Sequence, residues 1–389
     1  MKSNKWVAQR YQVNKQVLSI LKSGHPWVFR SHISSAIEVF ESGQLLKLVD
    51  HENKVCGYGL YDPDGLIAIR ILKDFREDSR TQWFALKLDK ALKKRQNLLN
   101  YTSAYRLLHG ENDGVPGVVL DVYGSTGVLQ TYSSSVDLMG RYFAQLAATK
   151  LKLTDLIWKT PTKRSSPKAT APIRTLRGHL PNQVKFQEGK MTFTVQIGSG
   201  QKSGAFLDLR ALRKWLSSQK LGGKKVLNLF SYTGTLALAA ETAGASEIWN
   251  VDISKGALDS GAKFHALDGK KHRFIQADVF EWLKELPEKE KFDLIIVDPP
   301  QMTSQVAQVP VALRAYRQLY SLSLKHLRPK GMIVGACCTS RIDRKKFKET
   351  VCPILVPPMK LLKSLEPEDD HPVGFPEGDY LKVMIFGGP

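Results

Sequence analysis

The sequence has few cysteines and no long hydrophobic run. Only 4 of its 389 residues are cysteine, and they lack the spacing of metal ligands, so no metal site is predicted. Two of them, Cys337 and Cys338, are adjacent, which is a poor geometry for a disulfide. No apolar run reaches the roughly eighteen residues of a membrane span, and the N-terminus has no apolar h-region. These absences indicate a protein of the reducing cytoplasm with no membrane-spanning segment.

Acidic residues are missing from two long stretches. No Asp or Glu occurs before Glu38, and none lies between Asp155 and Glu188. The formal net charge is +20. Solvated basic faces alone do not explain acid-free stretches, and no basic amphipathic helix of the membrane-binding kind stands out. The charge pattern therefore predicts a polyanionic partner, nucleic acid rather than a membrane surface.

Residues 226–300 alternate short apolar strands with helices. This alternation is typical of a doubly wound α/β sheet with a Rossmann-like ligand crevice at the strand ends. Three of the strands end in Asp. The strands are expected at 226–230, 247–251, 274–277 and 292–297, and the helices at 235–243, 255–267 and 280–286.

The turn after the first of these strands lacks two phosphate-binding signatures. It has neither the glycine-rich pyrophosphate fingerprint nor a Walker Lys-Ser/Thr, and Gly234 is its only glycine. Asp252 is placed to accept hydrogen bonds from ribose hydroxyls, and Asp278 to lie near an adenine amino group. A ligand with ribose and adenine but no phosphates fits best, and S-adenosylmethionine is such a ligand. The turn and the acids alone leave other Rossmann-like enzymes open.

The fourth strand ends in Asp298-Pro299-Pro300, where methyltransferases of this class place the target base. The next residue is Gln301 rather than an aromatic, which argues against adenine and exocyclic-amine methylation. A fifth strand, expected at 331–336, is followed by the two adjacent cysteines. Since successive strand residues face opposite ways, only one of the two thiols can point into the crevice.

A thiol in that crevice suits methylation of cytosine carbon 5. A thiolate adds to carbon 6 and makes carbon 5 nucleophilic enough to accept a methyl group; a base then removes the carbon-5 proton and the thiolate leaves. Asp298 is the candidate that supplies a proton at ring nitrogen 3. The alternative is a buried, inert cysteine, and residue type alone favours it.

The N-terminal part predicts a small β-barrel, because short apolar runs alternate with turns. Trp27 and Phe29 lie on one face of a strand there, so they either stack on bases or, as the alternation favours, belong to the core. Helices are expected at 78–100 and 136–151, with a turn at 110–117. Segment 159–185 is basic and rich in proline, and it predicts either an RNA-contacting loop or a flexible linker. The candidate RNA contacts are Trp27, Arg30, Lys163, Arg164 and Arg174.

Several motifs together resemble the RlmI/RlmK-like methyltransferases of large-subunit ribosomal RNA. They are His-Pro-Trp-Val-Phe at 25–29, a glycine-rich turn at 110–124, Gly-Gln-Lys-Ser-Gly-Ala-Phe-Leu-Asp-Leu-Arg at 200–210, Asn-Leu-Phe-Ser-Tyr-Thr-Gly at 228–234, Asp-Pro-Pro at 298–300, and Asp-His-Pro…Pro-Glu-Gly-Asp-Tyr-Leu-Lys at 370–382. The resemblance implies a PUA-like RNA-binding domain at 1–74, a middle α+β domain at 75–190 and a Rossmann-like class I methyltransferase domain at 191–389. It also implies ribosomal RNA as the partner.

The resemblance also implies roles for individual residues. The fifth strand of the cytosine-5 members ends in Ser-Cys-Ser-Gly, and matching strand ends puts Cys338 in the place of the nucleophile, with Asp298 beside it. His371 is implied to line the pocket. This chain departs from the family pattern in having Cys-Cys-Thr-Ser at that strand end and Gln301 in place of the usual Lys. The candidate cofactor-binding residues are Phe230, Tyr232, Thr233, Gly234, Asp252, Asp278, Lys202, Arg210 and Pro299, and of these Lys202 and Arg210 could bind a carboxylate.

Two other functions stay open at this point. One is methylation of a guanine nitrogen by the same domain, with Cys338 merely structural. The other is an RNA-binding ribosome-assembly protein without catalysis, against which the intact acids of the crevice argue. The sequence leaves the methylated nucleotide and the oligomeric state, a homodimer included, open.

Overall fold

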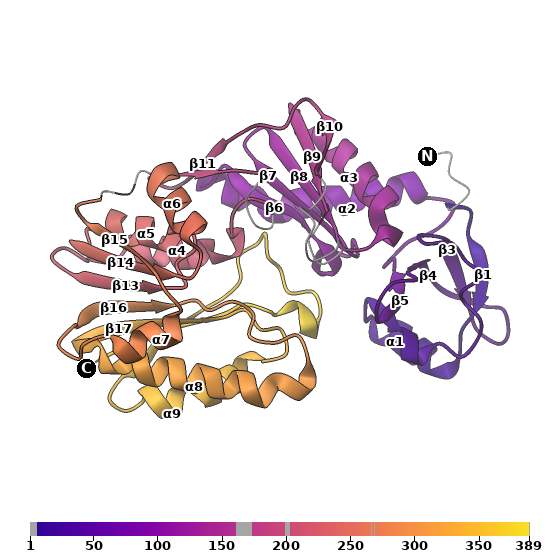
Figure 1. Cartoon of the computed structure of the whole chain (residues 1–389). Helices are drawn as coiled ribbons and strands as arrows, with labels where there is room; N and C mark the ends of the chain where they lie inside the picture. The colour runs from indigo at the N-terminus through magenta and orange to yellow at the C-terminus, as the bar shows by residue number, and fades with distance from the viewer. Residues whose placement is uncertain (1–5, 161–172, 199–202, 266, 268, 389) are drawn as a thin grey trace. The chain divides into compact units, whose positions relative to one another are not determined.

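The computed structural model describes residues 6–160, 173–198, 203–265, 267 and 269–388 (Figure 1). The chain divides into two compact units. Unit 1 comprises Met1–Phe186, Val195–Leu207 and Asp369–Phe375, and unit 2 comprises Gln187–Thr194, Asp208–Glu368 and Pro376–Pro389. The domain boundaries at 74/75 and 190/191 stay a prediction.

Unit 2 is built on a seven-stranded sheet whose first five strands are parallel. The strand order is β15-β14-β13-β16-β17-β19-β18, and β19 and β18 add to the edge in antiparallel fashion. The order reverses between β13 and β16, which is where open α/β sheets bind ligands beyond the strand ends. The strands are β13 Lys225–Leu229, β14 Glu247–Asp252, β15 His272–Gln276, β16 Phe292–Val297, β17 Leu327–Cys337, β18 Lys360–Leu365 and β19 Lys382–Gly387.

Helices cover both faces of this sheet, α4, α5 and α6 on one and α7, α8 and α9 on the other (Figure 1). The strands between the two layers are almost fully buried, as their near-continuous apolar sequences require. The helices are α4 Arg210–Ser217, α5 Thr235–Thr242, α6 Lys255–Phe264, α7 Val279–Glu285, α8 Val309–Lys325 and α9 Arg344–Leu355.

The predicted alternation of strands and helices in unit 2 is confirmed, with two differences. Helix α6 ends at Phe264 rather than near residue 267, because His265 leaves the helix and is buried against the Phe193 ring. The antiparallel strands β18 and β19 were not predicted. Strand β19 pairs with β17 across a long stretch of chain, and β18 pairs with β19 at the edge of the sheet. Local patterning carries little information about such pairing.

The N-terminal part of unit 1 holds a five-stranded sheet in the order β1-β3-β4-β5-β2. Helix α1, Lys15–Ser23, begins where the Asn14 side chain accepts a hydrogen bond from Val17 N and ends at Gly24 in the left-handed region, φ 73°. The strands are β1 Gln9–Gln12, β2 Trp27–Phe29, β3 Leu45–Val49, β4 Val55–Tyr61 and β5 Ile67–Ile71.

A second five-stranded sheet in unit 1 has the order β10-β9-β8-β7-β6. Helices α2, Arg80–Arg95, and α3, Asp137–Lys150, pack against it around a core rich in Phe, Trp and Leu. The predicted turn at 110–117 joins two of its strands. The strands are β6 Ala104–His109, β7 Val118–Tyr123, β8 Thr126–Thr131, β9 Asp155–Lys159 and β10 Ile173–Arg177, and a separate hairpin pairs β11 Val184–Glu188 with β12 Met191–Val195.

Strand β10 corrects the prediction that 159–185 is only a loop or linker. Residues 173–177 pair antiparallel with β9, and the Arg174 guanidinium lies 5.3 Å from the centre of the Trp158 ring. Backbone pairing and this cation–π contact order a segment whose composition predicts a loop. Lys163 and Arg164 lie outside the described residues. In the described part of the chain, no helix has the length and apolar character that crossing a membrane requires.

Gly335 of β17 provides a test of the packing in unit 2. A Cβ at this position would lie 2.9 Å from Tyr320 Cζ of α8, too close for an atom in a packed core. We expect Gly335→Ala to lower the free energy of unfolding by about 1–3 kcal/mol in urea titrations. Tyr320→Phe in the same background should recover part of the loss, since it removes a fully buried hydroxyl that has no hydrogen-bond partner among the described residues. An unchanged urea midpoint for Gly335→Ala would contradict this packing.

Candidate functional site

The turn between β13 and α5 is the first part of the site. Phe230 and Tyr232 adopt left-handed backbone conformations, φ 59° and 49°, and Gly234 follows at φ 75°. Three such residues within five positions make a tight turn, which a hydrogen bond from Gly234 N to Ser231 O at 2.8 Å closes. The Ser231 hydroxyl in this turn is buried and has no hydrogen-bond partner among the described residues, so a ligand polar group can use it.

Asp252, at the end of β14, is held against this turn. One carboxylate oxygen accepts a hydrogen bond from Tyr232 N and the other from Ser254 N, each at 2.8 Å. A carboxylate has about four acceptor positions, so two bonds fix its orientation and leave capacity for ribose hydroxyls. The next side chain, Ile253, is 69% exposed and offers an apolar surface for a base. Sequence reasoning missed Ile253, although an aliphatic residue directly after a strand-end Asp is a usable signal.

Asp278 has a structural role in addition to the predicted one. Its Oδ1 accepts hydrogen bonds from Phe280 N at 2.9 Å and Glu281 N at 3.1 Å, and so caps the first turn of α7. The side chain is exposed. The predicted contact of Asp278 with adenine stays a prediction.

Thr233 is positioned by α6. A Cβ on Gly261 would lie 2.7 Å from the Thr233 carbonyl carbon, so only glycine permits this approach. The Thr233 hydroxyl lies 3.4 Å from His265 Nε2. Burial, and to a smaller extent the charge of Arg213, lowers the pKa of His265 to about 4, so the ring is neutral at pH 7.

The loops after β16 and β17 bring Asp298, Pro299 and the two cysteines together. Cys337 is fully buried in the core of unit 2, whereas Cys338 is half-buried. The Cys338 Sγ lies 3.5 Å from the Pro299 carbonyl oxygen, to which the thiol donates. The two thiols differ in burial, and the Cys338 thiol contacts Pro299 of the Asp298-Pro299-Pro300 segment. Which thiol faces the ligand crevice stays a prediction.

Two buried polar side chains, Tyr316 and Lys382, support these loops, and a third, Tyr320, packs against β17 at Gly335. Sequence reasoning assigned no role to any of them. The Tyr316 hydroxyl is 3.2 Å from Thr339 Oγ1, and Lys382 Nζ donates to Thr339 O at 3.1 Å. Burial raises the pKa of Tyr316 and lowers that of Lys382. The third, Tyr320, lies one turn after Tyr316 on α8. This spacing on one face of an amphipathic helix, at i and i+4, was the available signal.

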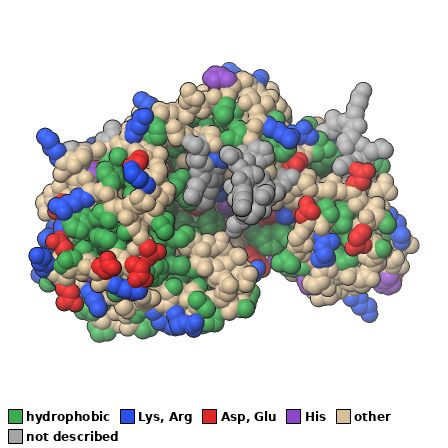
Figure 2. Space-filling model, viewed as in Figure 1, with side chains coloured by type: hydrophobic (Ala, Val, Ile, Leu, Met, Phe, Trp, Pro, Cys, Tyr) green, Lys and Arg blue, Asp and Glu red, His purple; other side chains and the backbone are tan. Residues whose placement is uncertain are grey.

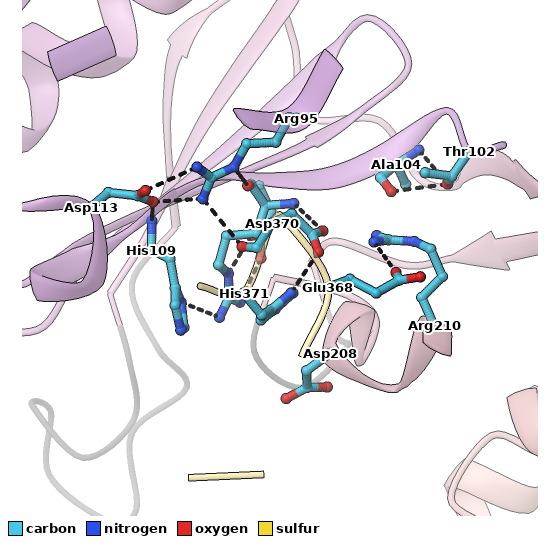
Figure 3. A network of polar contacts seen from close by, with 12 residues as sticks. Arg95, Thr102, Ala104, His109, Asp113, Asp208, Arg210, Glu368, Asp370 and His371 are labelled. Atoms are coloured by element: carbon cyan, nitrogen blue, oxygen red, sulfur yellow. Dashed lines mark hydrogen bonds and ion pairs between the residues drawn. The ribbon is translucent and has the colours of Figure 1, made fainter. Parts of the chain in front are cut away.

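Arg210 has protein partners in this structure, and its role in binding a ligand carboxylate stays a prediction. Its side chain is fully buried, and its guanidinium pairs with Glu368 at 2.9 Å (Figure 3). The guanidinium also lies 3.4 Å from Glu188. A buried guanidinium is stable only when carboxylates compensate its desolvation, and these two carboxylates do so for Arg210. Lys202, predicted to act with it, lies outside the described residues.

In unit 1, His371 belongs to a separate network of buried polar groups. His371 Nδ1 is 2.9 Å from Asp370 Oδ1, and Arg95 makes a bidentate pair with Asp113 at 2.9 and 2.6 Å (Figure 3). The His371 and His109 rings have centroids 5.1 Å apart. The predicted role of His371 in lining a pocket stays a prediction.

The two candidate RNA contacts at β2 are held by protein groups. Trp27 Nε1 donates to Glu111 at 2.8 Å, and the indole packs against Phe375 with ring centroids 4.9 Å apart. The Arg30 guanidinium donates to two backbone carbonyls of the turn 62–65. Trp27 and Phe29 are only half-buried, and Val28 between them is the residue of β2 that lies in the core. The interpretation of the two aromatics as core residues is therefore wrong. Binding of RNA by either residue stays a prediction.

Comparison with known proteins gives the family. Residues 164–386 match the sequence family described as S-adenosylmethionine-dependent methyltransferase, and residues 12–74 match a PUA-like domain. The chain is 33% identical to a Deinococcus radiodurans protein named Ribosomal RNA large subunit methyltransferase, over 97% of this chain and 96% of that protein. The chain belongs to the S-adenosylmethionine-dependent methyltransferases. It is also 31% identical to Ribosomal RNA large subunit methyltransferase I of Alteromonas mediterranea, over 94% of this chain and 95% of that protein.

Two solved structures share the fold of this methyltransferase. One, described as a SAM-dependent methyltransferase from Streptococcus mutans, has a TM-score of 0.82 at 22% identity and covers 97% of this chain and 99% of its own. The other, a methyltransferase complexed with SAH, has a TM-score of 0.83 with the same identity and coverage. The resemblance to the RlmI/RlmK-like methyltransferases and the predicted fold class, with a PUA-like domain and a Rossmann-like methyltransferase domain, are confirmed.

The cofactor of this methyltransferase is S-adenosylmethionine, as predicted. The residues present fit it. The fixed Asp252 carboxylate suits a ribose, the exposed Ile253 suits a base, and the partnerless Ser231 hydroxyl is available to a polar group. Within the described ranges, no three His, Cys, Asp or Glu side chains come together to hold a metal ion.

Two glycines of α6 test how the cofactor turn is positioned. We expect Gly261→Ala to push the Thr233 backbone out of place and to weaken binding of S-adenosylhomocysteine by at least about tenfold in calorimetry, because misplacing a positioned group by an ångström is costly. Gly256→Ala on the same helix is the control. No atom lies within 4 Å of its added Cβ, so it should leave binding unchanged and stabilise the helix by about 0.5–1 kcal/mol. Equal affinities for the two variants would show that the approach of α6 is unimportant.

Proposed function

We propose that this methyltransferase forms 5-methylcytidine in large-subunit ribosomal RNA, with Cys338 as the nucleophile. The observation that carries the proposal is the placement of the Cys338 thiol, half-buried and 3.5 Å from Pro299 O at the end of the adjacent strand. Relatives over nearly the whole chain are named for ribosomal RNA methylation, and the net charge of +20 suits an RNA substrate.

The proposed chemistry assigns one step to each residue. The Cys338 thiolate forms a bond to carbon 6 of cytosine, and Asp298 donates a proton to ring nitrogen 3. This addition turns the ring into an enamine, in which carbon 5 is nucleophilic. S-adenosylmethionine supplies the electrophilic methyl group. A base then removes the carbon-5 proton, the carbon 6–sulfur bond breaks, and the thiolate and the proton on nitrogen 3 are released.

The support for Asp298 is its position at the end of β16, directly before the Pro299 carbonyl that accepts from Cys338. Two prolines follow Asp298, the buried Pro299 and the exposed Pro300. Their rings fix the backbone φ angles after Asp298 and so restrict the direction of the chain there. Phe230, Tyr232, Thr233, Gly234, Asp252, Asp278 and Pro299 are proposed to hold the cofactor, and Arg210 and Lys202, the second of which lies outside the described residues, remain candidates for its carboxylate. Trp27, Arg30, Lys163, Arg164 and Arg174 are proposed to contact RNA.

The two adjacent cysteines give a matched pair of variants. Cys338→Ala should reduce turnover by about a thousandfold or more, as removal of a nucleophile generally does, and leave S-adenosylhomocysteine binding intact. Cys337→Ala should keep turnover and cost about 1 kcal/mol in urea unfolding, since it removes a buried sulfur from the core. If Cys338→Ala retains activity, the proposal of covalent catalysis by Cys338 is wrong.

The identity of the methylated nucleoside tests the reaction itself. Ribosomal RNA is incubated with the protein and methyl-labelled S-adenosylmethionine, digested to nucleosides and separated. We expect label in 5-methylcytidine. Label in a guanosine derivative would keep the fold and the cofactor but make Cys338 structural, and absence of label from every RNA despite cofactor binding would indicate a non-catalytic RNA-binding protein.

A further inference from the structure

A cavity of about 430 Å³ lies in unit 2 beside the loop that carries Cys338. One face of α8 forms its apolar floor, with the buried Val309 and the half-buried Leu313 one turn apart. Its rim carries four cations and no acidic residue: Arg314, Arg317, Arg341 and Lys346. The volume is in the range of small ligand sites, but the lining offers no acceptor side chain that would select a neutral polar ligand.

The rim cations make almost no stabilising side-chain contacts with described residues. Within the described ranges, Arg314, Arg317 and Lys346 make no side-chain hydrogen bond or ion pair, and Arg341 donates only to the Ser304 backbone carbonyl at 3.4 Å. Their neighbours outside the cavity differ. Arg344 of α9 pairs with Glu366 and Asp379, and Lys345 lies 3.9 Å from Glu349.

The charge of this region is also separated from the acidic residues of unit 2. In Figure 2, red side chains of unit 2 gather over the region that Figure 1 labels α7, and blue side chains lie along the lower edge, over α8 and α9. The four exposed cations around this cavity repel one another only weakly, because water and salt screen them, but together they make a site of positive potential that attracts an anion.

The cavity is linked to the catalytic loops by short connections. Arg341 follows Cys338 by three residues, which an extended chain spans in at most about 11 Å. Arg341 Nε reaches Ser304 O in the loop after β16, and Met302 N of the same loop donates to Thr339 Oγ1 at 3.1 Å. A group bound at the rim therefore lies within a nucleotide or two of a base held at Cys338.

We propose that this cavity binds the phosphodiester backbone of the RNA strand next to the target nucleotide. The inference rests on the proposed function and adds to it a site for the flanking phosphates. Guanidinium groups bind phosphate oxygens through paired N–H donors, and Arg314 and Arg317 lie one turn apart on the same face of α8, as tracking a backbone requires. The apolar floor at Val309 and Leu313 suits the face of a neighbouring unstacked base.

The test compares two double variants that remove the same charge. Arg314→Gln with Arg317→Gln removes two rim charges, and Lys345→Gln with Lys348→Gln removes two exposed charges of α9 that do not line the cavity. A short fluorescein-labelled single-stranded RNA of mixed sequence is titrated with each protein by anisotropy at about 50 to 200 mM salt. Binding of S-adenosylhomocysteine shows that each variant is folded.

The rim variant should lose roughly tenfold in RNA affinity and raise KM for RNA, and the slope of log K against log salt should become shallower by about 1.4, or about 0.7 for each lost phosphate contact. Arg314→Lys with Arg317→Lys should recover most of the affinity, because it keeps both charges. The Lys345/Lys348 variant should lose clearly less affinity.

Three results would overturn the proposal. They are equal losses for the two glutamine variants, wild-type affinity and salt slope for the rim variant, and displacement of RNA by poly-glutamate at equal charge, which would indicate an acidic protein partner. If the wild-type protein methylates RNA and the rim variant keeps both its RNA affinity and its KM, the cavity does not bind the RNA backbone, but the proposed function still holds. Failure of the wild-type protein to methylate any RNA, despite cofactor binding, would remove the proposed function as well.

Discussion

Thr339 holds together the two loops on which the candidate chemistry depends. Its side chain is fully buried; its hydroxyl accepts from Met302 N, in the loop after β16, and lies within hydrogen-bond distance of the Tyr316 hydroxyl. Its carbonyl accepts from the buried Lys382. These contacts join α8, β19 and both strand-end loops at one residue, and they fix the backbone directly after Cys338. A nucleophile has to be held within a fraction of an ångström of its target, and no regular secondary structure holds the chain beyond the end of β17.

Lys382 supports Thr339, but its burial carries the free-energy cost of desolvating an ammonium group. It is fully buried, its ammonium donates to three backbone carbonyls, and burial lowers its pKa. Burying an ammonium is unfavourable unless its hydrogen bonds are made, so a substitution that removes the charge would leave three carbonyls without their donor. The antiparallel strand β19, which lies between β17 and the edge strand β18, supplies this residue. The added edge of the sheet therefore contributes to the site, although its backbone lies outside the parallel strands that bind cofactors in such folds.

The parts of the fold that follow from local pattern could be predicted from the sequence. Strands β13, β14 and β16 are mostly apolar, Asp252 is the last residue of β14, and Asp298 directly follows β16. The parts that depend on distant partners could not be predicted. Strand β19 pairs with β17 from about fifty residues away, and Arg210 meets Glu188 and Glu368, which are distant in the chain. The composition of 173–177 predicts a linker. It cannot show that Arg174 stacks on the Trp158 ring of another strand, which helps to order this segment.

Whether a lysine or arginine is ion-paired with a protein carboxylate indicates a structural or a binding role better than whether it lies in a sequence motif. Arg210 stands in a motif that suggests ligand binding, yet a buried guanidinium has to be neutralised by protein carboxylates, and Glu188 and Glu368 provide them. Arg314 and Arg317 stand on what the sequence presents as the ordinary polar face of an amphipathic helix. Water solvates them, so the fold does not need to pair them, and among the described residues it does not. Because buried arginines are committed to protein carboxylates, cations that stay unpaired around a cavity are the ones available to a polyanion.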